Sequence, residues 1–201
     1  MPKLYTKTGD MGTTSLYDGN IIPKSSIFFK TLGSLDELNS HIGLMCGILK
    51  DRRGENSVPE IFRSIQVRLI DIGSNLAIVE EGVKKNVTKI TNEDVKELEE
   101  MIDIFDGKNS KLTVFILPGL YTEDGQCHVC RSTCRRFERD LWELNDAEGY
   151  FIKGSKQTIR LDTIKVDPVI MKYINRLSDL FFAYSRNLTG CQDIKITDIK
   201  N

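Results

Sequence analysis

Apolar residues recur every three or four positions in five long stretches of this sequence, and that spacing constrains the fold more than any other feature. In the stretch 58–81 they share one helical face: Ile61, Ile65, Leu69, Ile72 and Leu76. The other stretches are residues 33–51, 91–106, 122–145 and 166–190. Helices with one apolar face and short connections pack against one another. We therefore predict an all-α, five-helix bundle.

The start of the first helix is predicted from a capping pattern. Ser34 is followed three residues later by Glu37, the spacing of a capping box, just before the apolar run. A helix that begins there has Asp36 in its first turn, where the helix dipole favours a negative charge. Thr91 with Asp94 gives a similar signal for the third helix.

The fifth helix is bounded at both ends by typical residues. Asp167 before Pro168 predicts an N-cap with proline in the first turn, and Gly190 predicts the stop. Between the third and fourth helices, the apolar run 112–117 ends at Pro118, which predicts an extended, buried segment entering a turn.

Bulk properties exclude several classes of protein. A net charge of -1 over 201 residues argues against a general nucleic-acid or membrane-surface protein. No apolar run approaches the roughly 20 residues that span a bilayer. The first residues do not resemble a secretory signal, and an odd count of 5 cysteines favours a reducing compartment. We expect a cytoplasmic protein, or one of the mitochondrial matrix if a transit segment was removed.

The amino-terminal stretch "YTKTGDMGTTSLYDG", residues 5–19, combines glycines with many hydroxyl side chains. Backbone N–H groups of a glycine-containing turn can form a concave anion site, and Lys7 and Lys24 add positive charge. The stretch matches neither the Walker A pattern nor the Rossmann fingerprint. By itself it is equally compatible with an ordinary turn.

The predicted fourth helix carries a row of charge. Arg131, Arg135, Glu138 and Arg139 fall on one helical face, and Arg136 lies to one side. One interpretation is a solvated surface stabilised by pairs of opposite charge. The other is a clamp for phosphates, because the guanidinium group matches two phosphate oxygens at once.

The same helix holds the pattern C-x-x-C-x-x-x-C at Cys127, Cys130 and Cys134, with His128 beside it. Such spacing occurs in zinc and iron–sulfur sites. However, His128 lies about 100° around the helix from Cys127, and no fourth ligand is near in sequence. Buried thiols that pack in the bundle are the alternative.

Five blocks occur in order and at suitable separations: "YTKTGDMGTTS", "GSLDELNS", "FILPG", "HVCRSTCRRFER" and "NRLSDLFF". Together they resemble the PduO-type ATP:cob(I)alamin adenosyltransferases, from about residue 4 to about residue 188. The resemblance implies a helical bundle, a homotrimer with active sites between subunits, and transfer of the 5′-deoxyadenosyl group of ATP to Co(I) of cobalamin. It divides the chain into an ATP-wrapping segment (1–31), a bundle (32–190) and a tail (191–201).

The resemblance also implies roles for individual residues. Those expected to bind ATP, with Mg²⁺ on its phosphates, are Thr6, Lys7, Thr8, Gly9, Asp10, Thr14, Ser15, Lys24, Arg135, Arg136, Glu138, Arg139 and Asn175. Arg135 is the main triphosphate residue, and Arg131 with Asp36 forms an ion pair between subunits. Phe115 is expected to pack under the corrin ring and displace the lower cobalt ligand, although an apolar run alone predicts a core phenylalanine.

Some residues depart from the family pattern. Leu120 and Tyr121 follow Gly119 where a glycine-rich run is common, Ser25 and Ser26 replace an acidic pair, and Phe137 replaces a small residue. We therefore keep two alternatives open: an escort that delivers adenosylcobalamin to a client enzyme, and a helical interaction protein without activity. A cobalamin reductase is a further expected partner.

Overall fold

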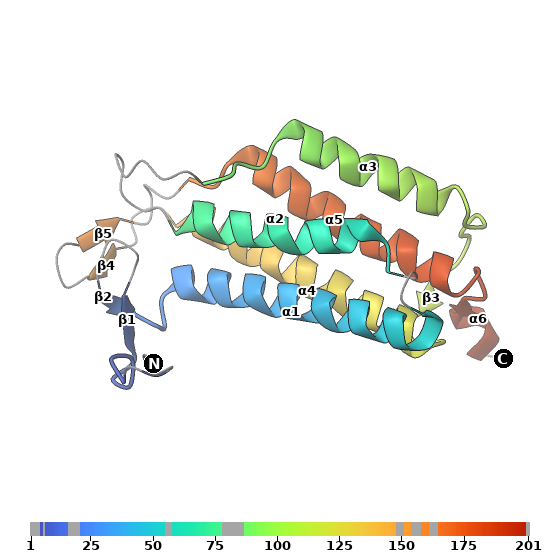
Figure 1. Ribbon diagram of the computed structural model, residues 1–201, viewed down its shortest axis with the longest axis horizontal. Coiled ribbons are helices and arrows are strands. Elements are labelled where there is room, and N and C mark those ends of the chain that lie inside the picture. The colour runs from blue at the N-terminus through green and yellow to red at the C-terminus, as the bar shows by residue number, and fades with distance from the viewer. Residues whose placement is uncertain are drawn as a thin grey trace.

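The computed structural model describes Tyr5 and residues 7–15, 21–54, 58–77, 87–147 and 165–199, and the backbone of residues 151–153 and 158–160. Its long helices lie side by side as a bundle (Figure 1), which confirms the predicted all-α class. They are α1 (Ile27–Arg53), α2 (Glu60–Leu76), α3 (Asn92–Asp106), α4 (Thr122–Asn145) and α5 (Pro168–Leu188). A short helix, α6 (Ile196–Ile199), follows them.

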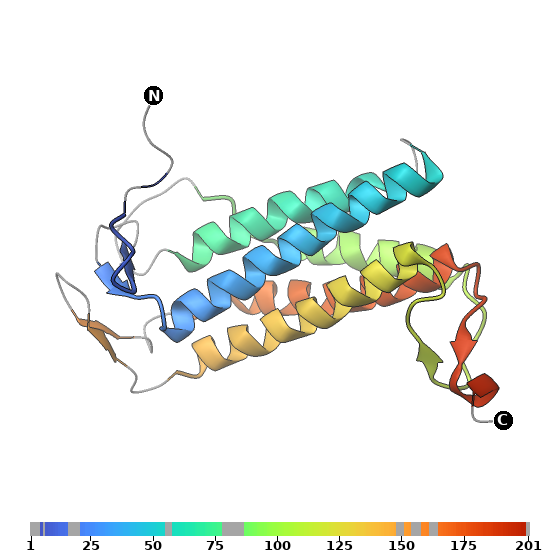
Figure 2. The same ribbon diagram turned by 90° about the horizontal axis from the view of Figure 1, so that it is seen from below.

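Three antiparallel two-stranded ribbons lie at the ends of the bundle. At one end are β1 (Thr13–Ser15) with β2 (Ile21–Pro23), and β4 (Phe151–Lys153) with β5 (Thr158–Arg160). At the opposite end β3 (Ile116–Leu117) pairs with β6 (Ile194–Lys195), as Figure 2 shows. The helical periodicity did not predict the β4–β5 ribbon or the strand β6.

The core is centred on α5, which packs against α3 and α4, while α1 packs against α2 and α4. Aromatic rings meet at the α2–α3–α5 contact: Phe62 lies 4.8 Å from Tyr184, and Tyr184 lies 4.9 Å from Phe105, between ring centroids. The apolar face predicted for residues 58–81 is buried as expected. Within the described part of the chain, no helix has the length and apolarity needed to cross a membrane.

Two predicted helix starts are confirmed and one is wrong. Thr91 and Asp94 form the capping box of α3, and Asp167 caps α5. By contrast, α1 begins at Ile27 with Ser26 as its N-cap, so Ser34 lies inside the helix and donates its hydroxyl to the Thr31 carbonyl. The reason is that buried residues from Phe28 onward extend the apolar face toward the amino terminus.

The earlier start of α1 changes the interpretation of Asp36. This residue lies in the interior of the helix and not in its first turn. The helix dipole acts mainly on the terminal turns, so it does not account for the charge of Asp36.

The segment 110–121 is extended, as predicted, but it is not buried. It crosses the end of the bundle, where only β6 pairs with it, and the side chain of Phe115 is 85% exposed. Burial was predicted because a continuous apolar run usually marks a core strand. Here the run lies outside the core.

Two neighbouring residues of α3 test how this helix packs on α5. We expect Phe105→Ala to lower the free energy of unfolding by about 3–5 kcal/mol, because it removes a ring that packs on Tyr184. Ile104→Ala, at a side chain that is 49% exposed, should change it by less than about 0.5 kcal/mol. Urea unfolding of both variants measures the difference; equal effects would contradict the arrangement of α3 on α5.

Candidate functional site

A row of three guanidinium groups runs along α4. Arg135 and Arg139 are exposed, Arg131 is half-buried, and Arg139 Nη1 donates to the Arg135 carbonyl at 3.1 Å. Among the described residues, none of the three forms an ion pair with a carboxylate. Burial, and then the charge of Arg135, lower the pKa of Arg131. Three guanidiniums in a row, with Glu138 as a negative charge on the same helical face, form a surface on which an anion would be stabilised.

The buried face of α4 determines which way this row points. Cys127, Cys130, Cys134 and Phe137 are all 0% exposed. Burying these side chains sets the rotation of the helix about its axis, so the arginine row stays at the surface. The spacing of four residues along the helix is what makes Arg131, Arg135 and Arg139 neighbours.

Arg136 lies to one side of the row, as predicted, and it is not free of partners. It forms an ion pair with Glu37 of α1. Farther along the contact between α1 and α4, Lys30 of α1 contacts Asp140 at 3.1 Å and Glu143 at 2.7 Å. Arg136 thus joins α1 to α4, a role that the sequence pattern did not suggest.

Glu138 and Asn175 are brought together in a chain of polar contacts that links three helices. Asn175 Nδ2 donates to Glu138 Oε1 at 2.9 Å, and Arg176 Nη1 donates to Asn175 Oδ1 at 2.7 Å. Arg176 Nε in turn donates to Glu99 Oε1 at 2.9 Å. The sequence analysis missed Arg176 and Glu99; the position of Arg176 directly after Asn175 was the only signal.

The amino-terminal turn brings Gly9 and Lys24 together. A Cβ atom on Gly9 would lie 2.8 Å from Lys24 Nζ, so the lysine side chain lies across this turn. The Lys24 amide donates to the Gly12 carbonyl at 2.9 Å, and Lys7 adopts a positive φ of 61°. These contacts place the lysine charge on the glycine-containing turn.

The other predicted residues of this segment lie on or beside the same turn. Thr14 and Ser15 belong to β1 and pair with β2, while Thr8 and Asp10 are exposed. Thr6 lies outside the described residues.

Asp36 and Arg131 do not form an ion pair with each other in the described part of the chain. Asp36 lines a groove of about 340 Å³ between α1 and α2, whose other lining residues include Leu69 and Ile70. Arg131 Nε instead lies 3.4 Å from His128 Nδ1. Beside Asp36, the buried Oδ1 atom of Asn39 has no hydrogen-bond partner among the described residues. This groove therefore has an unmet hydrogen-bond acceptor as well as a negative charge.

The β3 strand, which Phe115 directly precedes, and the β1–β2 ribbon lie at opposite ends of the bundle (Figure 1). Helix α4, which runs between these ends, has 24 residues, or about 36 Å at 1.5 Å per residue. The arginine row occupies the middle of that length. The exposed phenylalanine thus lies far from the glycine-containing turn of the same chain.

The cysteines of α4 are buried thiols that pack in the core. Cys127 Sγ lies 3.1 Å from Met45 Sδ, and Cys134 Sγ lies 3.3 Å from the Ile174 carbonyl. Burial raises the pKa of Cys130 to about 12, which keeps it a thiol. His128 Nε2 lies 3.3 Å from Ser185 Oγ. Over the described ranges, no three His, Cys, Asp or Glu side chains are grouped so that they could hold a metal ion.

Comparison with known proteins agrees with this arrangement. The family model for cobalamin adenosyltransferase matches residues 4–188. A cobalamin adenosyltransferase of Cupriavidus metallidurans is 35% identical over 192 residues, which cover 94% of this chain and 89% of the relative. A corrinoid adenosyltransferase of Bacillus subtilis is 36% identical over 184 residues, covering 92% and 85%.

A solved structure is similar over almost its whole length. It is a variant, with one phenylalanine replaced by alanine, of a PduO-type ATP:corrinoid adenosyltransferase from Lactobacillus reuteri complexed with cobalamin and ATP. The TM-score is 0.79 at 27% identity, and the match covers 96% of this chain and 98% of that one. Fold and sequence agree, and the chain belongs to the cobalamin adenosyltransferase family.

Proposed function

We propose that this protein transfers the 5′-deoxyadenosyl group of ATP to Co(I) of cobalamin, forming adenosylcobalamin and inorganic triphosphate. The observation that carries the proposal is the row of three guanidiniums on α4, none of which pairs with a carboxylate among the described residues, in a chain of this family. The cobalt electron pair forms the bond to C5′ while the bond from C5′ to the phosphate oxygen breaks. That second electron pair leaves with the triphosphate.

In this reaction the protein has to orient two substrates and stabilise the leaving charge. Arg135 and Arg139 are exposed and have no carboxylate partner in the described structure, so they can bind phosphate oxygens directly. One donor aimed at developing charge is worth roughly 3 kcal/mol of activation free energy. Because Arg136 is paired with Glu37, we assign it a supporting role beside the triphosphate.

Glu138 and Asn175 would contact the nucleoside part of ATP. Their mutual hydrogen bond, and the bond from Arg176, fix both side chains before a ligand arrives. Preorganised polar groups lose little conformational entropy on binding.

The amino-terminal segment would close over the triphosphate. Lys24 lies across the Gly9 turn, where its charge can reach phosphates, and the residues of the turn add backbone and hydroxyl donors. The residues proposed for this segment are Thr6, Lys7, Thr8, Gly9, Asp10, Thr14 and Ser15.

Magnesium would be bound chiefly by the substrate. The described residues offer no group of three carboxylates, imidazoles or thiols around a common point. Mg²⁺ commonly retains water and phosphate oxygens in such sites, with one or two protein oxygens. The hydroxyls of Thr14 and Ser15 and the Asp10 carboxylate are the oxygens available near the turn. We propose that Mg²⁺ enters with ATP and lowers the charge on the leaving triphosphate.

Phe115 would pack against the corrin ring. Contact with water is unfavourable for a phenylalanine side chain that is 85% exposed, and the flat ring of a substrate can cover it. From below the corrin, it would take the place of the lower cobalt ligand. Co(II) without that ligand is more easily reduced to the nucleophilic Co(I).

The active form would be a homotrimer with sites between subunits. Cobalt and C5′ must meet, yet the glycine-containing turn and Phe115 of one chain lie at opposite ends of the bundle. A neighbouring subunit would bring them together. The groove beside Asp36 could accept Arg131 of that neighbour, which would also supply a donor for Asn39.

Residues 1–201 would form one domain: an ATP-wrapping segment (1–31), a bundle (32–190) and a tail (191–201). The cytoplasm and the mitochondrial matrix are both compatible with five free cysteines. A reductase would supply Co(I), and an adenosylcobalamin-dependent enzyme would receive the product.

The reaction can be tested directly. Mixing the protein with Mg-ATP and chemically reduced cobalamin should produce the visible spectrum of the light-sensitive adenosyl product, together with triphosphate. Binding of cobalamin without conversion would favour the escort function instead. No interaction with either substrate would refute both.

We expect Arg135→Ala to lower turnover by at least about a hundredfold, because it removes a donor to the leaving triphosphate. Its thermal midpoint should stay close to that of the wild type, since the side chain is exposed. Arg63→Ala is the matched control: this exposed arginine of α2 donates to Gln66 Oε1 at 2.6 Å. Wild-type turnover in Arg135→Ala would remove the residue from the mechanism.

Mixed oligomers test the site between subunits. Asp36→Arg and Arg131→Asp should each abolish activity when present in every subunit, because each places like charges across the proposed pair. After the two proteins are unfolded and refolded together, activity should return, since mixed trimers contain interfaces with opposite charges. No recovery, or a monomer in sedimentation, would argue for a site within one subunit.

A further inference from the structure

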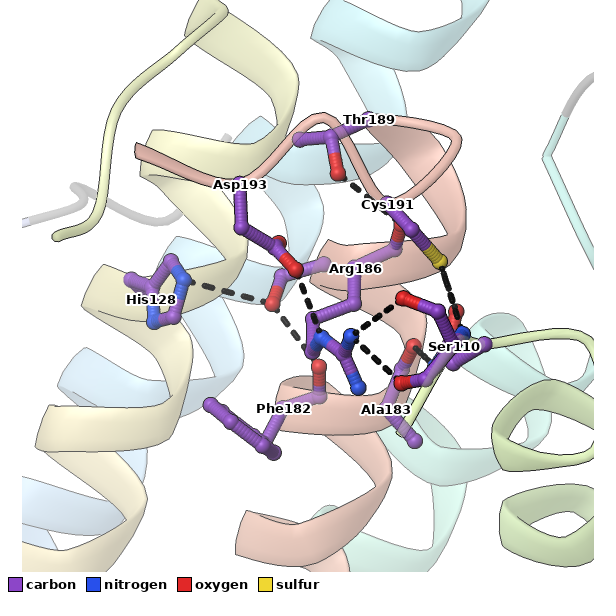
Figure 3. A network of polar contacts seen from close by, with 10 residues as sticks. Ser110, His128, Phe182, Ala183, Arg186, Thr189, Cys191 and Asp193 are labelled. Atoms are coloured by element: carbon purple, nitrogen blue, oxygen red, sulfur yellow. Dashed lines mark hydrogen bonds and ion pairs between the residues drawn. The ribbon is translucent and has the colours of Figure 1, made fainter. Parts of the chain in front are cut away.

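A buried arginine near the end of α5 has no part in the chemistry proposed above. Arg186 is 4% exposed, and its Nε donates to Asp193 Oδ2 at 3.0 Å (Figure 3). The Asp193 side chain is only 7% exposed. Burying an ion pair carries a desolvation penalty that often exceeds its attraction. Such a pair need not stabilise the fold. Its effect on the position of the segments that it joins is more informative.

The same guanidinium holds a second segment. Its Nη2 donates to the Ser110 carbonyl at 2.8 Å and lies 3.4 Å from Ser110 Oγ. Figure 3 shows both contacts beside the bond to Asp193. Arg186 therefore joins the loop after α3 to the loop after α5, two segments far apart in the sequence.

Further contacts fasten these two loops to each other and to α5. The Ser110 amide donates to Cys191 Sγ at 3.2 Å, and Asn109 Nδ2 donates to the Ala183 carbonyl at 2.9 Å. Cys191 has a φ of 61°, a region that residues other than glycine rarely adopt, and its amide donates to the Arg186 carbonyl at 3.1 Å. The surrounding contacts keep the turn in this conformation.

Both loops lead directly into the ribbon that carries Phe115. Ile116 in β3 pairs with Lys195 in β6, and the Ile196 amide donates to the Phe115 carbonyl at 3.1 Å. A ribbon of two residues per strand is too short to be stable in water. Since the Phe115 side chain is mostly exposed, packing does little to orient it. Its position then depends on the anchors at both sides of the segment: those of the two loops, and Asp124, which accepts from the Gly119 and Tyr121 amides.

We propose that Arg186 is a positioning residue, which sets the place of Phe115 by holding Ser110 and Asp193 at a fixed separation. The inference rests on the proposed contact of Phe115 with the corrin ring. Arg186 itself would touch neither substrate. It acts through the β3–β6 ribbon, and so it affects cobalamin and not ATP.

Arg186→Lys tests this proposal, because lysine keeps the charge but lacks the planar fork that reaches both loops. We expect the KM for cobalamin to rise about tenfold while the KM for ATP is unchanged. With ATP bound, the fraction of cob(II)alamin that lacks its lower ligand should fall, which its absorption spectrum measures. Asp193→Asn is a milder change of the same ion pair. It should also raise the KM for cobalamin and lower the fraction of cob(II)alamin that lacks its lower ligand.

Arg68→Lys is the matched control. Arg68 Nη2 contacts Asp94 Oδ1 at 2.8 Å, and the Asp94 side chain is 7% exposed, like that of Asp193. This pair lies near the start of α3, away from the β3–β6 ribbon. Arg68→Lys should lower the thermal midpoint by less than Arg186→Lys, because the Arg68 side chain is 35% exposed, and it should leave both KM values and the cob(II)alamin spectrum as in the wild type.

Hydrogen exchange gives a measurement that needs no substrate. In Arg186→Lys and in Asp193→Asn, the Ile196 amide should exchange about tenfold faster, because its bond to Phe115 opens more often. Arg68→Lys should not change it. If the wild type fails to make adenosylcobalamin, the proposed function falls. The exchange rate of the Ile196 amide would still test whether Arg186 holds the β3–β6 ribbon in place. Unchanged exchange and an unchanged spectrum in Arg186→Lys would overturn the proposal.

Discussion

The repulsion among Arg131, Arg135 and Arg139 is the interaction on which the proposed site depends. Their spacing of four residues on α4 makes them neighbours, and buried side chains of the same helix, among them Cys127 and Phe137, keep the row at the surface. The folded bundle pays for this arrangement in part through the half-burial of Arg131, whose pKa is lowered. A polyanion bound along the row would relieve the repulsion, which makes ATP a ligand that favours the folded state.

Helix α5 links the two ends of the molecule. Near its first half, Asn175 belongs to the polar chain from Glu99 to Glu138, and near its end Arg186 holds the loops beside Phe115. Between these points its side chains form much of the aromatic core. Asn175, assigned to the nucleotide, and Arg186, proposed to position Phe115, therefore lie on one helix, although different subunits would bring the nucleotide and the corrin to the same site.

Much of the fold followed from the sequence because helices are encoded locally. The period of apolar residues and the caps at Thr91 and Asp167 were enough for α2, α3 and α5. The start of α1 was misplaced because Ser34 offers a capping pattern that the apolar face continuing from Phe28 overrides. The exposure of Phe115, the pairing of β3 with β6 and the partners of Arg136 and Arg186 depend on contacts between distant segments. No local pattern reports these.

The strand β6 follows every helix of the bundle in the chain, while its partner β3 precedes α4. The ribbon therefore depends on a segment that lies beyond the bundle in the sequence. A change that detached residues 189–199 from the bundle would remove the strand beside Phe115 and leave the long helices α1 to α5 packed. The surroundings of Phe115 could thus be lost without unfolding of the protein.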